Sequence, residues 1–321
     1  MTKHNLPLYL LFSLAILLFP FLIANEYFLT VMIVIGINAL VALGLILLIG
    51  FTGQLSLCQA AFYGIGAYTT GVLSAKFSFN PWFSIAVGIV MACCLAFVLG
   101  LPALKLKGHY LAMATLGFGE IINIVFKEWG NLTGGPSGLI GIPQLALGGF
   151  MFDTDLRYYL LVWFIVLVVI AILFNLTNSR IGRGLLSIKH SEEAAASLGV
   201  AVATYKIKIF MCCAALGALG GGLYAHYITV ISPEAFDVFH SIVLIIMVVT
   251  GGLTYIEGGV IGAFLFTLIP ELLQAVEDYS IITYGFILLF ILMFMPQGIA
   301  GLFNSGIKKI KGHLFNKVNV L

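Results

Sequence analysis

The chain has 321 residues, of which 61% are hydrophobic and only 9% are charged, with a formal net charge of +2 at pH 7. A water-soluble globule of this length needs far more polar surface, so the composition excludes a soluble protein and indicates one that uses lipid as its solvent. Apolar runs such as 160–174 are of helix length and lack the two-residue alternation of barrel strands, which excludes a transmembrane β-barrel. The expected fold is an all-α, polytopic bundle of membrane helices.

Apolar windows of about 20 residues, the length that crosses a bilayer, recur along the chain between charged or Pro/Gly-rich breaks. They predict about ten transmembrane helices, with a range of eight to ten. The third, fifth, eighth and ninth windows are short or interrupted by Gly, Gln or Glu, so they are candidates for broken or re-entrant helices. The windows are 7–24, 28–49, 53–75, 82–104, 109–127, 158–175, 207–231, 240–254, 258–275 and 281–302.

The basic residues are distributed unevenly among the predicted loops. With ten spans and a cytoplasmic amino terminus, twelve of the fifteen fall inside, whereas Lys76, Lys127 and Arg157 fall outside. Because cytoplasmic loops carry the excess of Lys and Arg, we expect a multi-pass membrane protein with both termini in the cytoplasm. The twelve are Lys3, Lys105, Lys107, Arg180, Arg183, Lys189, Lys206, Lys208, Lys308, Lys309, Lys311 and Lys317.

The predicted organisation is one transmembrane domain, 1–306, followed by a basic cytoplasmic tail, 307–321. The tail suits anionic lipid at the membrane surface rather than nucleic acid. Two longer polar segments interrupt the spans. The external one, 128–157, is rich in Gly and Pro and uncharged over much of its length, so we expect it to pack against the membrane domain. The cytoplasmic one, 176–206, is charged and has helical character.

Uncharged polar residues and one carboxylate fall inside predicted spans. Gln54, Ser56 and Gln59 lie in the third window. Glu120 lies near the middle of the fifth, where a carboxylate costs about 3 kcal/mol, with Asn123 three residues later, which predicts a polar stripe facing the bundle interior. These five residues are candidates for the translocation pathway. The alternative is structural: hydrogen bonds between helices, and a buried carboxyl bonded to a neighbour.

The cytoplasmic segment contains a predicted amphipathic helix over 191–202. Ser191 is a suitable N-cap, and Glu192 and Glu193 follow in the first turn, where the helix dipole favours negative charge. Ala195, Leu198 and Val202 recur at helical spacing, and Gly199 allows close approach or a bend. This helix is either a plain surface helix between two spans or an element that docks a cytoplasmic partner.

The same residues resemble a known motif. Glu193-Ala194-Ala195, followed by Gly199 and Ile209, resembles the E-A-A loop of ABC-importer permeases, although Met211-Cys212 replaces the family's Leu-Pro. Further segments, in order along most of the chain, resemble branched-chain amino acid permeases of the M type. They are Gly53-Gln54-Leu55-Ser56, Ala60-Ala61-Phe62, Gly64-Ile65-Gly66-Ala67-Tyr68, Leu106-Lys107-Gly108, Ala114 to Ile121, Leu132 to Leu139 with Gly141-Ile142-Pro143, Gly251-Gly252-Leu253, and Pro270-Glu271-Leu272-Leu273.

The resemblance implies a transport subunit, not an enzyme, that works with four further chains and the lipid bilayer. They are a second homologous permease forming a heterodimer, two cytoplasmic ABC ATPases and an external solute-binding protein. Glu192, Glu193, Ala194, Ala195, Leu198 and Gly199 would form the ATPase-coupling element. No lysine directly follows a glycine, so the chain has no phosphate-binding loop of its own. We expect no cofactor, no catalytic site, and no metal site, since the five cysteines lie in apolar windows.

Two alternative functions remain open. Related permeases carry urea or short amides, so the family does not fix the substrate. An ion-coupled secondary transporter would use Glu120 as its ion site, but it has no need of a coupling helix with a Glu-Ala-Ala signature.

Overall fold

The computed structural model describes Ile16, Pro20, residues 26–106 and 108–272, Gly285, Gly298, Ile299 and Gly301. In this part of the chain, five helices are long and apolar enough to cross a bilayer. They are α2 (Glu26–Leu45), which continues as a π-helical segment (Ile46–Phe51), α4 (Pro81–Ala103), α5 (His109–Glu128), α7 (Asp155–Asn178) and α10 (Val202–Ile228).

Three shorter helices complete the described bundle: α3 (Gln59–Ala75), α11 (Val238–Gly251) and α12 (Ile256–Leu272). Eight of the ten predicted windows therefore contain a helix. The windows 7–24 and 281–302, and the tail 307–321, lie almost wholly outside the described residues. The expectation of a helical membrane protein is confirmed, and the ten-span count and the sidedness stay predictions.

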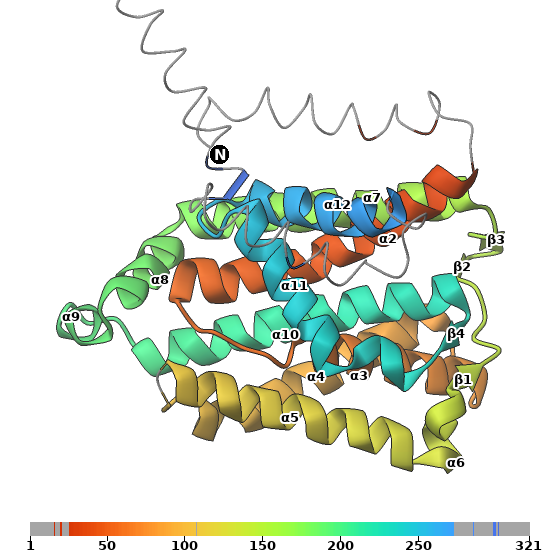
Figure 1. Cartoon of the computed structure of the whole chain (residues 1–321), viewed down its shortest axis with the longest axis horizontal. Coiled ribbons are helices and arrows are strands. Elements are labelled where there is room, and N and C mark those ends of the chain that lie inside the picture. Colours follow the sequence, from red (N-terminus) through yellow and green to blue (C-terminus); the bar gives the residue numbers. More distant parts are fainter. Residues whose placement is uncertain are drawn as a thin grey trace, which may run out of the picture.

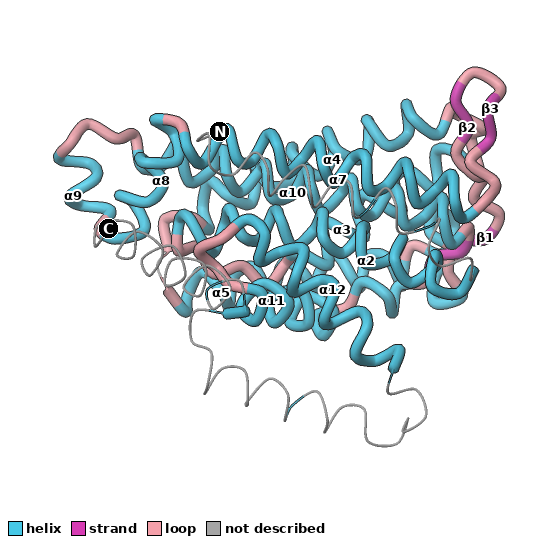
Figure 2. The backbone as a smooth tube through the Cα atoms, turned by 90° about the horizontal axis from the view of Figure 1, so that it is seen from above, coloured by secondary structure: helices cyan, strands magenta, loops and turns pink. Residues whose placement is uncertain are grey.

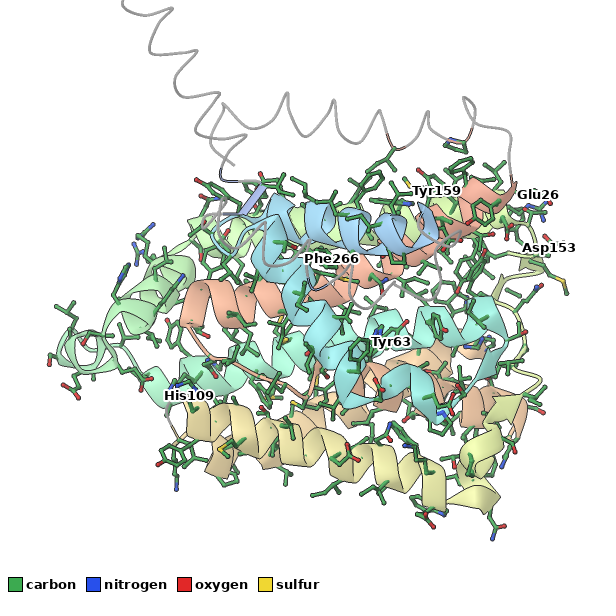
Figure 3. All side chains as sticks on the ribbon, viewed as in Figure 1. Glu26, Tyr63, His109, Asp153, Tyr159 and Phe266 are labelled. Carbon is green, nitrogen blue, oxygen red and sulfur yellow. The ribbon has the colours of Figure 1, made fainter. Side chains whose placement is uncertain are left out.

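The helices lie side by side along the long axis, with different structures at the two ends (Figure 1). At one end α8 (Arg180–His190) and α9 (Glu192–Ser197) project beyond the bundle; we call this the α9 end. The opposite end carries all the described strands and is called the strand end (Figure 2). Glu26 and Asp153 lie at the strand end and His109 at the α9 end (Figure 3).

Helix α2 forms the centre of the bundle. It is apolar on every side, and Ile33, Ile35, Leu40 and Leu43 are completely buried. A helix without a polar face has to be surrounded by others, and α2 packs against α7, α10, α11 and α12.

Helices α3 and α10 approach closely because glycines line their contact. A Cβ at Gly221 would overlap the carbonyl oxygen of Tyr63, and a Cβ at Gly66 would overlap that of Ala218. Small residues allow such approach between membrane helices, where dispersion and packing replace the hydrophobic effect as the main attraction. This contact fixes the position of α3 relative to α10.

The strand end is built from the external segment predicted at 128–157. It comprises α6 (Gly130–Thr133), a 3-10 turn (Gly135–Ser137), β1 (Leu139–Ile140), β2 (Ala146–Leu147) and β3 (Phe150–Met151), and it is completed by β4 (Val230–Ile231) and a second 3-10 turn (Pro233–Phe236). β2 and β3 form a hairpin across Gly148-Gly149, both with positive φ as a type I′ turn requires. β1 pairs antiparallel with β4.

Segment 128–157 packs on the rest of the bundle, as predicted. Leu139, Ile142 and Leu145 are buried, and the indole nitrogen of Trp82 donates to the Ala146 carbonyl oxygen at 2.9 Å. The four two-residue strands are a small departure from an all-α chain.

Candidate functional site

Two helices begin inside the bundle rather than at its ends. The third window is not helical from residue 53: after Thr52 the chain runs without helix to Cys58, and α3 starts only at Gln59. The side-chain amide of Gln59 donates to the Cys213 carbonyl oxygen at 3.1 Å, near the middle of α10. The third window is therefore a broken helix, non-helical at first and helical from Gln59, which is one of the two predicted alternatives (Figure 1).

The second internal start belongs to α11. Residues 229–237 turn back from the strand end through β4 and the 3-10 turn, and Asp237 caps α11 by accepting from the His240 backbone N–H at 2.8 Å. Asn123 on α5 donates to the Pro233 carbonyl oxygen at 2.9 Å, which ties this returning segment to α5.

Hydroxyl groups from neighbouring helices stabilise the internal start of α3. The Ala60 N–H donates to Ser241 Oγ on α11 at 2.9 Å, and the Leu57 N–H donates to Thr115 Oγ1 on α5 at 3.0 Å. A helix start has free N–H groups that need partners in an apolar environment. α3, α5 and α11 therefore form one junction, which we call the central junction.

Four of the five predicted pathway residues are buried within this chain. Gln54, Ser56, Gln59 and Asn123 are each at most 3% exposed. Gln54 donates to Thr52 Oγ1 at 2.8 Å, Ser56 lies 3.2 Å from Cys58 Sγ, and Gln59 and Asn123 donate to backbone carbonyls. Their contacts are those of packing groups, and only the Gln54 Oε1 lacks a partner in the described residues.

Glu120 has a different position. The predicted stripe facing the bundle interior was wrong, because Asn123 is buried in the chain whereas Glu120 lies on the adjoining, exposed face of α5. Around it Met113, Ile121 and Ile124 are 70%, 60% and 49% exposed. α5 is the least hydrophobic of the five span-length helices. In contrast, the exposed residues of α4 and of the central turns of α7 are apolar.

The α9 end forms the second candidate site. Ser191 caps α9 as predicted, accepting from the Ala194 N–H at 3.2 Å. The predicted continuous helix over 191–202 was wrong: α9 ends at Ser197, and Val202 begins α10. Gly199, with φ of 83°, closes a Schellman motif in which the Val200 N–H donates to the Ala195 carbonyl oxygen at 3.0 Å.

This turn changes what the predicted apolar face does. Ala195 is buried against the rest of the chain, but Leu198 is 80% exposed, more than any other large hydrophobic residue described. Glu193 and Ala194 are also exposed. No atom of the chain lies within 4 Å of a Cβ at Gly199, so this glycine is needed for its backbone conformation and not for a close approach.

Two lysines fasten α8 and α9 to the membrane helices. Lys206 of α10 is 4% exposed and pairs with Glu192 at 2.6 Å. Lys189 of α8 donates to the Gly50 carbonyl oxygen, in the π-helical end of α2, at 2.7 Å. From the sequence, both lysines are signals of topology only. No local sequence pattern predicts that Lys206 contacts Glu192 or that Lys189 contacts Gly50, because both contacts depend on the tertiary fold.

The two groups of basic residues that the sequence analysis separates lie at opposite ends of the bundle. Lys105, Arg180 and Arg183 lie at the α9 end, in or beside α4 and α8, whereas Lys127 and Arg157 lie in α5 and α7 at the strand end. In the described residues no group of three His, Cys, Asp or Glu side chains is arranged to hold a metal ion. The two sites are therefore the exposed face of α5 and the α8–α9 unit.

Comparison with known proteins identifies the family. Residues 27–295 match the family described as branched-chain amino acid transport system / permease component. The permease protein LivM of the high-affinity branched-chain amino acid transport system of Escherichia coli (strain K12) is 31% identical over 286 residues, which cover 82% of this chain and 67% of LivM. LivM of Salmonella typhimurium is 29% identical over 286 residues, with the same coverage of both chains.

A second kind of permease also matches. LivH, a permease protein of the same Escherichia coli (strain K12) system, is 23% identical over 290 residues, which cover 82% of this chain and 91% of LivH. No solved structure matches the chain. The family match covers most of the bundle, including α5, the central junction and the α8–α9 unit, and the chain therefore belongs to the permease components of branched-chain amino acid transport systems.

Proposed function

We propose that the chain is one membrane subunit of an ATP-binding-cassette importer that moves branched-chain amino acids across the bacterial inner membrane. Its partners are a second homologous permease, two cytoplasmic ATPases and an external solute-binding protein. The observation that carries the proposal is the α8–α9 unit, a short helical element that projects from a permease bundle and exposes a leucine at its tip.

The α9 tip suits contact with an ATPase. Exposed Glu193, Ala194 and Leu198 offer a small apolar centre with an acidic rim, the usual make-up of a docking patch. Ala195 anchors α9 from below, and Gly199 ends it.

Two contacts connect the α8–α9 unit to the membrane helices. Glu192 pairs with Lys206, at the start of α10. Lys189 holds the end of α2, immediately before the non-helical run that leads to the central junction. Both contacts end at residues that position α3, so movement of the α8–α9 unit is transmitted to a helix start deep in the bundle.

The exposed face of α5 supports a pathway between two permeases. A carboxylate facing lipid at this depth is costly, so Glu120 needs a protein partner or water beside it. This chain resembles both LivM and LivH, two permease proteins of one transport system. We place the second permease against α5, with Glu120 on the wall of the pathway between the subunits. Gln54, Ser56, Gln59 and Asn123 support that wall from inside the chain.

The sidedness follows from charge. The α9 end carries most of the basic residues in the described chain and faces the cytoplasm under the positive-inside rule. The strand end, with Glu26, Asp153 and Asp155, faces outward.

Reconstitution tests the function. The chain, co-expressed with the permease and ATPase genes that accompany it, is purified and placed in liposomes with the binding protein. Uptake of leucine, isoleucine or valine that requires ATP supports the proposal. ATP-driven uptake of urea or acetamide alone would assign the related amide function, and uptake driven by a proton or sodium gradient without ATP would assign a secondary transporter.

A further inference from the structure

A cavity of about 270 Å³ lies at the strand end, between the starts of α2 and α7 and the end of α10. Exposed Gln144, Asp153 and Thr154 form its mouth, and buried Tyr158 and His226 form its floor. Asp153 marks its position in Figure 3. The cavity is remote in the fold from the exposed face of α5, since α5 does not line it.

Asp155, in the first turn of α7, lines this cavity. It accepts hydrogen bonds from the hydroxyls of Tyr227 at 3.2 Å and Thr30 at 3.4 Å, both long for charge-assisted bonds. The neighbouring Arg157 is already engaged by Asp153 at 2.6 Å. In the described chain no lysine or arginine pairs with Asp155.

His226 adds a second acceptor to the lining. Its Nδ1 lies 2.6 Å from the Pro143 carbonyl oxygen, which can only accept, so Nδ1 carries the proton and Nε2 of the neutral ring has a lone pair. The side chain is completely buried, and Nε2 has no hydrogen-bond partner among the described residues. A buried acceptor without a donor is uncommon in a finished site.

Aromatic side chains form part of the remaining wall. The rings of Tyr158 and Tyr227 lie 4.9 Å apart and present aromatic surface to an incoming methylene stem or cation. A free amino acid fits poorly, because its carboxylate would meet Asp153 and Asp155. A metal ion lacks the three ligating side chains that would hold it in the described residues.

We infer that the cavity receives the ammonium or guanidinium group of a lysine or arginine side chain presented by the external solute-binding protein. The inference rests on the proposed function, which places the strand end outside and supplies this partner. The cavity is large enough for the end of one long side chain. Asp155 supplies the charge, and Tyr227 and Thr30 hold its carboxylate in position.

The test measures docking of the binding protein to the assembled transporter in nanodiscs. Asp155→Asn keeps the shape of the side chain and its hydroxyl contacts but removes the charge, and it should weaken docking at least about tenfold. Glu26→Gln is the matched control: it makes the same type of change on an exposed acid at the same end, outside the cavity, and should leave docking unchanged.

A second pair of variants places a longer side chain in the cavity at position 30. Thr30→Lys places a cation beside Asp155 and should weaken docking as strongly as Asp155→Asn, whereas Thr30→Met, of similar length but uncharged, should weaken it less. Equal docking by wild type, Asp155→Asn and Thr30→Lys, with amino acid uptake intact, overturns the inference and leaves the proposed function standing. A wild-type transporter that docks no binding protein overturns both.

Discussion

At the scale of single residues, Glu120 is the group whose environment differs most from its neighbours. It lies on the exposed face of α5, whereas Asn123, one turn later, is buried and bonded within the chain. Sequence spacing places them about 60° apart around the helix, close enough for one stripe. In the structure the boundary between the buried and the exposed surface of α5 falls between them.

Substitution of Glu120 tests the wall of the pathway. Glu120→Gln should insert and assemble but lower uptake by about tenfold or more, since an amide keeps the hydrogen bonds and loses the charge. Glu120→Lys should fail to assemble with the second permease, because a cation reverses that charge in an apolar contact. Uptake and co-purification are measured for both, with Ile124→Ala on the same face as control. Normal uptake by Glu120→Ala would contradict the assignment.

Lys189 makes a second residue-scale prediction. Lys189→Met removes the bond from α8 to the Gly50 carbonyl oxygen and should reduce the stimulation of ATP hydrolysis by substrate-loaded binding protein several-fold, with ATPase binding retained. Lys189→Arg, which can still donate, should restore most of it. Loss of ATPase binding in Lys189→Met would instead show that the lysine holds the docking surface itself.

At the scale of elements, α9 is defined by its two ends. Ser191 starts it and the left-handed Gly199 stops it, which leaves Leu198 on the turn and 80% exposed. Leu198→Asp should leave the permease in the membrane but weaken ATPase binding about tenfold or more, as for a central docking contact. Leu147→Asp, an exposed leucine at the strand end, is the control. Equal ATPase binding by both variants would remove α9 from the interface.

The close contact between α3 and α10 predicts that a side chain introduced at its glycines destabilises the bundle. At Gly221 the atom in the way is a backbone oxygen, that of Tyr63, so the helices must separate to accept a side chain. Gly221→Val should destabilise the bundle by about 3 kcal/mol and lower Tm by roughly 5–10 °C. Gly130→Ala has open space around its Cβ and should change Tm little. Thermal unfolding in detergent compares the two, and an unchanged Tm in Gly221→Val would contradict this packing.

At the scale of the whole molecule, sidedness is the property to test. In intact cells a membrane-impermeant maleimide should label Leu147→Cys, at the strand end, and should label Leu198→Cys only after permeabilisation, because positive-inside sorting places the α9 end in the cytoplasm. Reporter fusions after Phe174 and Phe303 should both indicate cytoplasm. The reverse labelling pattern, or a periplasmic reporter at either site, would overturn the orientation.

The sequence by itself determined the class of the protein and most of its helices. Apolar windows of bilayer length and the ordered family segments depend on composition and local pattern, which act before any tertiary contact forms. The N-cap at Ser191 was predictable for the same reason, since a cap is a bond within three residues.

Only the tertiary structure decided where α3 begins, which way Glu120 faces, and what holds the α8–α9 unit to the membrane helices. The start of α3 is stabilised by Ser241 and Thr115 from distant helices. The ion pair between Glu192 and Lys206 and the hydrogen bond from Lys189 to the Gly50 carbonyl oxygen form only when separate segments of the chain pack together. Helical periodicity fixes which residues share a face, but which face meets protein depends on neighbours that no local pattern encodes.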